Sequence, residues 1–229
     1  MKFPELIPAI FIKRDNRFLA SVRLLTGEKA AAFVPTTGRL TGALRPGCRA
    51  WLAPSSNPKR KTRYTLVLSE LDNGGLCSVN ATMANDLVAE ALRERNLAAF
   101  RYERIEKEVT FGRSRLDFRL LQEDEACWME VKSVTYAEDG LGKFPDAPTS
   151  RGRKHLGELA KLAARGDRAS AVFVAQREDV LSFAPFETID AEFTETLRQV
   201  HKEGVEVHAY RCDVSLEKVE IAEEIPVDL

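Results

Sequence analysis

EVTFGRSRLDFRLLQEDEACWMEVK, residues 108–132, is the stretch from which the fold can be read most directly. Apolar, aromatic and β-branched residues at 109–111 and 116–121 predict one arm of a β-hairpin, and those at 127–134 predict the other. The polar run 122–125 predicts the turn between them. We therefore expect this stretch to form the central hairpin of a sheet.

Charged residues alternate with apolar ones along both arms. Strand side chains point to opposite faces in turn, so Leu116 and Phe118 are expected on one face and Asp117 on the other. Glu130 and Lys132 share a face of the second arm for the same reason. If the two polar faces coincide, Asp117, Glu130 and Lys132 converge.

Two carboxylates and an ammonium group suit the metal-assisted cleavage of a phosphodiester. Asp117 and Glu130 can hold a hard divalent cation such as Mg²⁺ and leave positions for water and a phosphate oxygen. Lys132 can orient the attacking water or neutralise developing charge. Glu108, just before the first arm, is a further candidate metal ligand. The alternative is a charged outer face with weak ion pairs, which the spacing alone does not exclude.

The composition is balanced in charge, with 34 Lys and Arg against 35 Asp and Glu and a net charge of −1. Any site for a polyanion must therefore be a local patch. The four cysteines lack the spacing of a zinc site or a disulfide framework, which is typical of reduced residues in an intracellular protein. The sequence predicts no signal peptide and no membrane span, so the expected location is the cytoplasm.

Residues 1–80 alternate short apolar runs with turn residues such as Asp15-Asn16 and Pro46-Gly47. Five or so strands without a helix predict a small β-barrel of the OB type or a compact sandwich. OB barrels commonly bind nucleic acids. We assign residues 1–80 to an OB-like, nucleic-acid-binding domain and residues 81–229 to a second domain.

The first domain carries a basic run between two predicted strands, in SSNPKRKTRY at 55–64. Such a loop can follow a phosphate backbone without reading sequence, and the alternative is a solvated loop without a partner. Basic residues in the preceding hairpin turn can extend the patch. The candidate contacts to nucleic acid in this domain are Arg14, Arg17, Lys59, Arg60, Lys61 and Arg63.

The second domain begins with a predicted helix in 80–97, capped by Asn80 or Asn85. A long loop is expected at 137–148, followed by a helix capped by Thr149 or Ser150. Basic residues at its first turn oppose the helix dipole, but they fit a bound phosphate; the alternative is an end that faces solvent. The candidate contacts to nucleic acid there are Arg151, Arg153, Lys154 and His155.

The remaining residues alternate between the two kinds of element. A strand at 169–175, a helix at 191–201 and a strand at 205–210 follow, and an acidic tail ends the chain. Together with the central hairpin they predict an α/β (α+β) domain with a mixed sheet whose central strand is covered on both faces.

FPDAPTSRGRKHLGEL at 144–159, with EVKSVT, SRLDF and NPKRKTRY upstream, closely resembles the sugar fermentation stimulation protein A family of bacteria and archaea over nearly the whole chain. The resemblance implies an OB-like N-terminal domain and a C-terminal domain like the PD-(D/E)xK (restriction-endonuclease-like) nucleases. It also implies DNA binding and a link to maltose utilisation. Asp117, Glu130 and Lys132 would correspond to the nuclease signature, and Glu108 falls at the family's Glu-Val position.

Two positions depart from the family pattern. Thr36 stands where the family usually has asparagine before Thr-Gly, and Asp86 stands where an arginine often follows the asparagine equivalent to Asn85. The second change removes a positive charge from a possible DNA-binding face.

Two functions follow from these observations. The first is a DNA-binding nuclease that depends on Mg²⁺ or Mn²⁺. The second is a non-catalytic, largely sequence-nonspecific DNA-binding regulator of sugar (maltose) metabolism genes, although no helix-turn-helix is evident. A carbohydrate-binding module is a third, weaker alternative, because no exposed aromatic platform is identified. The sequence does not indicate the oligomeric state.

Overall fold

The first third of the chain is a small closed β-barrel. In the computed structural model, which describes residues 1–55, 57 and 59–229, the strands follow the order β3-β2-β1-β4-β5-β6, and a short parallel pairing of β3 with β5 closes the ring. Apolar side chains fill the interior, as expected of the OB-like barrel that the sequence predicts. The strands are β1 (Ile7–Asn16), β2 (Leu19–Leu24), β3 (Lys29–Phe33), β4 (Arg49–Pro54), β5 (Tyr64–Glu70) and β6 (Leu76–Ser78).

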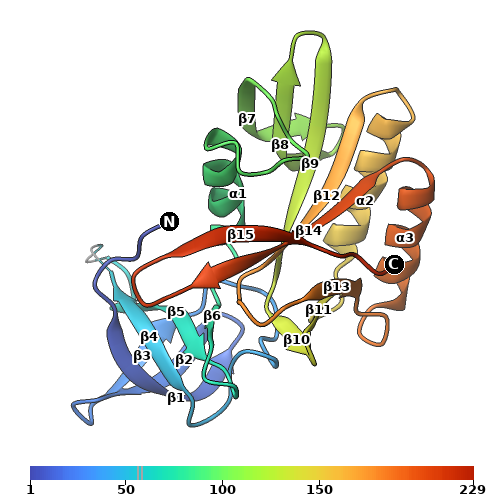
Figure 1. Cartoon of the computed structure of the whole chain (residues 1–229). Helices are drawn as coiled ribbons and strands as arrows, with labels where there is room; N and C mark the ends of the chain where they lie inside the picture. Colours follow the sequence, from blue (N-terminus) through green and yellow to red (C-terminus); the bar gives the residue numbers. More distant parts are fainter. Residues whose placement is uncertain (56, 58) are drawn as a thin grey trace.

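The rest of the chain builds a mixed sheet in the order β15-β14-β12-β9-β8-β7 (Figure 1). Strands β9, β12 and β14 are parallel to one another, and the outer strands are antiparallel to their neighbours. Its strands are β7 (Arg104–Phe111), β8 (Ser114–Gln122), β9 (Glu125–Val134), β12 (Arg168–Ala175), β14 (Glu206–Val214) and β15 (Val219–Ile225). A smaller sheet contains β10 (Tyr136–Glu138), β11 (Leu141–Phe144) and β13 (Ser182–Pro185).

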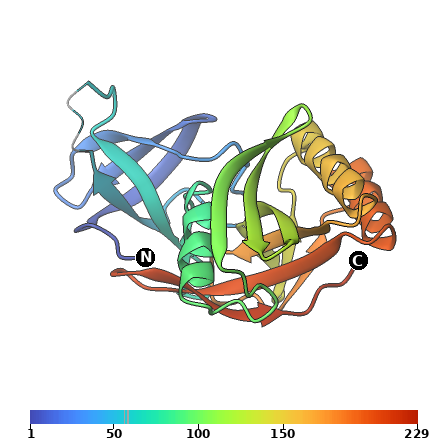
Figure 2. The ribbon, with the colours of Figure 1, turned by 90° about the horizontal axis from the view of Figure 1, so that it is seen from above.

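Helices cover both faces of the large sheet (Figure 2). Helix α1 (Met83–Arg93) packs on one face, and α2 (Ser150–Ala163) and α3 (Ala191–Lys202) pack on the other. The central strand β12 is buried along nearly its whole length, which agrees with its almost continuous apolar sequence. In the part of the chain that the structure describes, no helix has both the length and the apolar character to cross a membrane.

Three segments differ from the sequence prediction. The stretch 108–121 holds parts of two strands rather than one arm, because Gly112 takes a left-handed φ of 57° where β7 turns back as β8. The predicted loop at 137–148 contains the hairpin β10–β11, which turns at Gly140 with a φ of 80°. The acidic tail forms β15, an antiparallel partner of β14. Glycine turns set the ends of the strands in the first two segments, and pairing with β14 makes the third segment a strand. Local apolar content does not predict either effect.

The strands β7 and β8 change face in the middle. Leu116 packs in the core under α2 and α3, whereas Phe118 packs in the core under α1, so the prediction that they share a face is wrong. Glu108 has a left-handed φ of 58°, and the pairs that flank it are Lys107 with Phe118 and Val109 with Leu116. This irregularity breaks the strand alternation at Asp117.

The barrel and the second domain are joined by a shared core and by buried polar contacts. Trp51 of β4 belongs to the same apolar cluster as α1. Arg177, 5% exposed, donates to the carbonyl oxygens of Gly42 in the barrel (3.1 Å) and of Thr135 in the second domain (2.9 Å), and its guanidinium pairs with Asp179. These contacts fix the two domains against each other.

The first residues of the chain lie against the beginning of β15. The β14–β15 hairpin extends toward the barrel, near the N-terminus (Figure 1). The backbone N–H of Phe3 donates to the carbonyl of Glu217 (2.8 Å), and that of Val219 donates to the carbonyl of Met1 (2.9 Å). The first residues therefore form a strand-like pairing with the beginning of β15.

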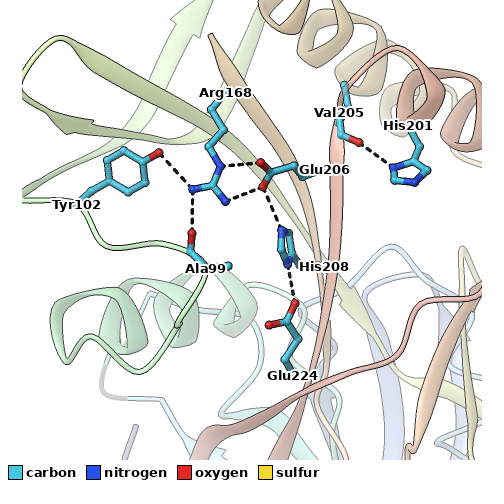
Figure 3. A network of polar contacts seen from close by, with 8 residues as sticks. All are labelled: Ala99, Tyr102, Arg168, His201, Val205, Glu206, His208 and Glu224. Carbon is cyan, nitrogen blue, oxygen red and sulfur yellow. Dashed lines mark hydrogen bonds and ion pairs between the residues drawn. The ribbon is translucent and has the colours of Figure 1, made fainter.

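A polar network joins the first residues of the neighbouring strands β12 and β14 (Figure 3). Arg168 of β12 donates through two nitrogens to the two carboxylate oxygens of Glu206, each at 2.7 Å. The same guanidinium contacts the hydroxyl of Tyr102 (3.3 Å), and His208 lies between Glu206 (3.1 Å) and Glu224 (2.6 Å).

Candidate active site and nucleic-acid interface

The candidate site lies where β8 separates from β9. Their ladder ends with the pair Phe118 and Met129, and beyond it the carboxylate of Asp117 accepts the backbone N–H of Val131 at 2.7 Å. The other oxygen of Asp117 accepts the side-chain amide of Asn85 on α1, also at 2.7 Å. The side chain of Asp117 therefore replaces a strand hydrogen bond at the point where the strands diverge.

Glu130 is the most buried member of the site, with 2% of its surface exposed. Its Oε1 atom contacts both the ammonium group of Lys132 and the Nδ1 atom of His155 on α2. Its Oε2 atom is buried and has no hydrogen-bond partner among the described residues. A buried carboxylate oxygen without a partner is costly unless a ligand completes it.

The two carboxylates differ in their electrostatics. Burial, together with the charge of Glu130, raises the pKa of Asp117 above its ordinary value, against the opposing effects of Lys132, the Val131 N–H and Asn85. Burial alone would raise the pKa of Glu130 as well, but the charge of Lys132 and the hydrogen bonds from His155 and Lys132 outweigh it and lower that pKa. A cation beside Asp117 would relieve its unfavourable environment.

These residues fit a hard divalent cation. Asp117 keeps free lone pairs on both oxygens, and Glu130 offers an unused oxygen. Mg²⁺ in proteins is commonly held by one or two carboxylates, with waters and substrate phosphates as the other ligands. No group of three or more His, Cys, Asp or Glu suited to holding a metal occurs within the described ranges. The carboxylates available at this site are those of Asp117 and Glu130.

Glu108 has an exposed side chain that is paired with an arginine. Its side chain is 47% exposed and forms an ion pair with Arg115 at 2.6 Å. It lines the same cavity as Asp117, but the structure describes no contact between the two side chains. The suggestion that Glu108 is a metal ligand remains a prediction.

The site opens into a cavity of about 980 Å³ between the barrel and the second domain. Asp117 and Lys132 line its second-domain side, and the barrel contributes the turn after β1 and the segment after β3. The basic residues along the cavity are Arg17, Lys107, Lys132 and Arg151. A phosphate backbone that enters this cavity would thus meet positive charge on both sides.

The four basic residues predicted at the start of α2 have different environments. Arg151 is exposed and lines the cavity. Arg153 instead pairs with Asp190, the N-cap residue of α3, at 3.0 Å. Lys154 donates to the carbonyl of Arg113 at 2.8 Å, and His155 is buried against Glu130 rather than exposed. The helix is capped by Thr149, one of the two residues expected to do so.

A second cavity of about 520 Å³ lies between α2 and the β7–β8 turn, lined by Arg113, Ser114, Arg115, Ser150, Arg151, Lys154 and His155. The hydroxyl of Ser114 is buried there without a hydrogen-bond partner among the described residues. The basic surface around α2 thus extends to the β7–β8 turn.

The basic residues of the barrel also differ from one another. Arg14 is partly buried and donates to the backbone carbonyls of Gly38 and Thr36, the latter at 3.1 Å, so it supports the segment after β3. Arg17 is exposed in the cavity. Arg60 contacts Phe33 and the hydroxyl of Thr65 (3.1 Å). The other three, Lys59, Lys61 and Arg63, are exposed on the 55–64 loop, of which Ser56 and Pro58 lie outside the described residues.

Asn85 is the residue of the site that the sequence did not reveal. The sequence predicts it as a helix cap, but the N-cap residue is Thr82, and the Asn80 side chain accepts the N–H of Thr82 at 3.1 Å. Asn85 sits inside the first turn of α1 and faces Asp117. The neighbouring Asp86, one of the two departures from the family pattern, pairs with Lys107 at 3.1 Å.

The chain matches two sequence models of one family. The model described as "SfsA N-terminal OB domain" matches residues 12–79, and the model described as "Sugar fermentation stimulation protein RE domain" matches residues 82–218. A sugar fermentation stimulation protein homolog of Moorella thermoacetica is 46% identical over 229 residues, covering 98% of this chain and 97% of the homolog. The homolog of Desulforamulus reducens is 42% identical over 228 residues, covering 99% and 94%.

A solved structure has the same fold. SfsA of Pyrococcus furiosus, determined in complex with Ca²⁺, superposes with a TM-score of 0.90 at 31% sequence identity and covers 100% of both chains. Both domains and their arrangement are therefore shared with that protein.

Proposed function

The chain belongs to the sugar fermentation stimulation protein family, and from this membership and the geometry of its site we propose that it is a DNA-binding, metal-dependent nuclease. The observation that carries the proposal is the buried, unpartnered Oε2 atom of Glu130 beside the carboxylate of Asp117 and the ammonium group of Lys132. The Ca²⁺ in the structure of the Pyrococcus furiosus relative supports the use of a divalent cation.

Each residue of the site has a distinct role in this proposal. Asp117 and Glu130 hold Mg²⁺ or Mn²⁺, with Glu108 as a further candidate. When bound there, such a cation would polarise the phosphate and lower the pKa of a bound water. Lys132 is held on the same face of β9 as Glu130, where its ammonium group can orient the attacking water and offset charge that develops on the phosphate.

The basic surface on both sides of the cavity would hold the DNA. Arg17 on the barrel and Arg151 at the start of α2 are exposed in the cavity and suited to contact phosphates. Lys59, Lys61 and Arg63 on the barrel loop extend this surface. Arg153 and Arg14 act differently, because their guanidinium groups are engaged in contacts within the protein.

The test is cleavage of labelled single-stranded and duplex DNA by the purified protein, in EDTA and with Mg²⁺ or Mn²⁺. Lys132→Met and Asp117→Asn are expected to lower the cleavage rate by about 10²–10³-fold or more. Lys132→Met is expected to leave the DNA affinity nearly unchanged, because the lysine stabilises the transition state rather than the bound DNA.

Lys161→Met is the matched control, since Lys161 is an exposed lysine of α2 paired with Glu158. Cleavage by Lys132→Met at the wild-type rate would contradict the assignment. Salt-sensitive binding without cleavage under either metal would support instead a non-catalytic regulator that binds DNA through the same surface.

A further inference from the structure

Two aromatic side chains of the barrel lie in the cavity that contains the candidate active site. Phe18 is in the turn between β1 and β2, and Phe33 ends β3. Their ring centroids are 6.3 Å apart and their planes differ by 20°, so the rings are nearly parallel and offset. The strand pairing of Leu19 with Phe33 fixes this arrangement.

A basic residue supports the pair. The guanidinium group of Arg60 lies 5.1 Å from the centroid of Phe33 and donates to the hydroxyl of Thr65 at 3.1 Å. The backbone N–H of Phe18 donates to the side chain of Asn16 at 2.9 Å, which orders the turn that carries it. The position of the aromatic pair is therefore set by the barrel before any ligand binds.

Phe18 is 47% exposed. Among the described residues, four large apolar side chains are exposed, and Phe18 is the aromatic one. Leu25, Leu181 and Leu216, the others in that group, do not line the cavity, whereas Phe18 lies in it with Arg17, Asp117 and Lys132. One exposed ring among charged groups gives too small an apolar area for docking another protein. It matches a ligand that alternates flat rings with phosphates.

We propose that Phe18, supported by Phe33 and Arg60, is a stacking site for an unpaired nucleobase, so that the cavity takes single-stranded nucleic acid. A paired base in a duplex has both faces covered by its neighbours, so only an unpaired or displaced base can present a face to Phe18. The inference rests on the proposed function, because it assumes that the ligand is a nucleic acid. It adds that this nucleic acid is single-stranded.

The test measures binding in EDTA, without cleavage, by fluorescence anisotropy. Three labelled probes are compared: oligo(dT), the same oligomer with abasic sites, and a duplex. Phe18→Ala is expected to weaken binding of oligo(dT) about 5- to 150-fold, while Phe18→Tyr keeps the ring and binds within about twofold of the wild type. The abasic oligomer and the duplex should bind equally to the wild type and to Phe18→Ala.

Leu25→Ala is the matched control, because Leu25 is 65% exposed outside the cavity and should not affect any probe. An equal loss for oligo(dT) and the abasic oligomer, or no loss for either, would overturn the stacking site. So would a change in sedimentation of Phe18→Ala without a change in affinity, which would make Phe18 a contact between copies of the chain.

Cleavage assays with Mg²⁺ separate this inference from the nuclease proposal. Base-dependent binding that requires Phe18, without cleavage, would support the stacking site and refute the nuclease. If Phe18→Ala cleaves duplex DNA at the wild-type rate and shows no preference for unpaired bases, the nuclease proposal is supported and the stacking site is refuted.

Discussion

His155 is buried against one carboxylate of the candidate site. Its Nδ1 atom contacts one oxygen of Glu130, and the other oxygen of that carboxylate has no partner among the described residues. The contact fixes the rotamer of Glu130, so we regard His155 as a positioning residue. Groups that orient a metal ligand in this way typically change metal affinity or activity about 10- to 100-fold when they are removed.

We predict that His155→Ala weakens binding of Mn²⁺ by about 10- to 100-fold, because Glu130 loses the partner that orients it. Isothermal titration with Mn²⁺ measures this without DNA or cleavage. His201→Ala is the matched control, since His201 lies at the end of α3 and its ring contacts the carbonyl of Val205, away from the site. Unchanged Mn²⁺ affinity in a folded His155→Ala protein would refute the positioning role.

In the structure Asp117 accepts the N–H of Val131, between Glu130 and Lys132, which are themselves paired. Alternation along strands predicts that Glu130 and Lys132 share a face, but it does not place Asp117, because the alternation breaks there. The same rule could not show that Glu108 adopts a left-handed backbone conformation or that Asn85 faces Asp117. Those two facts depend on how β7 and α1 pack against β8, which no local pattern encodes. The residue roles proposed for the site remain predictions.

The first turn of α2 separates two uses of arginine. Arg151 is exposed in the cavity, whereas Arg153 joins α2 to Asp190 and Glu192 of α3. The sequence predicts that both arginines bind phosphate, because they are two residues apart in the same helical turn. Spacing alone does not show that α3 lies beside Arg153. The two residues offer a matched pair for mutation.

We predict that Arg151→Ala weakens DNA binding and lowers the slope of log K against log salt by about 0.7–0.9, with the free energy of unfolding within about 0.5 kcal/mol of the wild type. Arg153→Ala should do the opposite, losing about 1–3 kcal/mol of stability with little change in the salt slope. Salt-dependent binding curves and urea unfolding measure the two effects. A lowered salt slope in Arg153→Ala would contradict this division.

The pairing of Arg168 with Glu206 stabilises the contact of β12 with β14 (Figure 3). Burial alone would raise the pKa of Glu206, but hydrogen bonds from Arg168 and His208 outweigh it and lower that pKa below its ordinary value. Stability from a lowered pKa is present above the unfolded-state pKa and is lost as pH falls through the folded-state pKa.

We predict that Glu206→Gln lowers the free energy of unfolding by about 1 kcal/mol at about pH 7, a modest value because the pair is partly exposed and screened. The difference from the wild type should shrink as the pH falls below about 4.3, the ordinary pKa of a glutamate, and the carboxylate becomes protonated. Urea unfolding of both proteins at about pH 7 and at a pH below about 4.3 measures whether the stability difference shrinks as expected. Arg168 stays charged throughout, whereas His208 contacts Glu206 in the wild type and loses this partner in Glu206→Gln. The comparison that tests the explanation is therefore the trend below about pH 4.3, and a difference that grows there would contradict it.

The helices and the buried strand β12 could be predicted from the sequence, because each has a long run of apolar residues at the spacing of its element. The hairpin β10–β11 and the strand β15 did not, since both are rich in polar residues with partial or full exposure. Their strand character comes from partners elsewhere in the chain, β13 and β14. The local amino-acid composition therefore indicates how exposed these strands are, but it does not indicate which strands they pair with.

The two domains share one apolar cluster, in which β4 and β5 of the barrel contact α1 and the large sheet. The OB-like barrel and the mixed sheet were expected from the sequence, but the joint at Arg177 was not. The cavity of the candidate site lies between the two domains that this joint connects.

We predict that Arg177→Met lowers the free energy of unfolding by about 3 kcal/mol or more, because it leaves buried carbonyls and Asp179 without their partner. The chain has two tryptophans, Trp51 in the barrel and Trp128 in the large sheet. Urea unfolding can therefore be followed at two places, where the barrel contacts α1 in Trp128→Phe and in the large sheet in Trp51→Phe. The two midpoints should coincide when Arg177 is present and separate in the Arg177→Met background. Coincident midpoints in both backgrounds would show that the apolar contacts alone couple the domains.

The pairing of the first residues with β15 sets the order in which the molecule can be completed. Met1 and Val219 are 218 positions apart in the chain, yet they are hydrogen-bonded. During synthesis the barrel strands leave the ribosome first and can pair among themselves, while the partner of the leading segment has not yet been made. The leading segment, although it is translated before β15, can thus reach its final place only after β15 has been made.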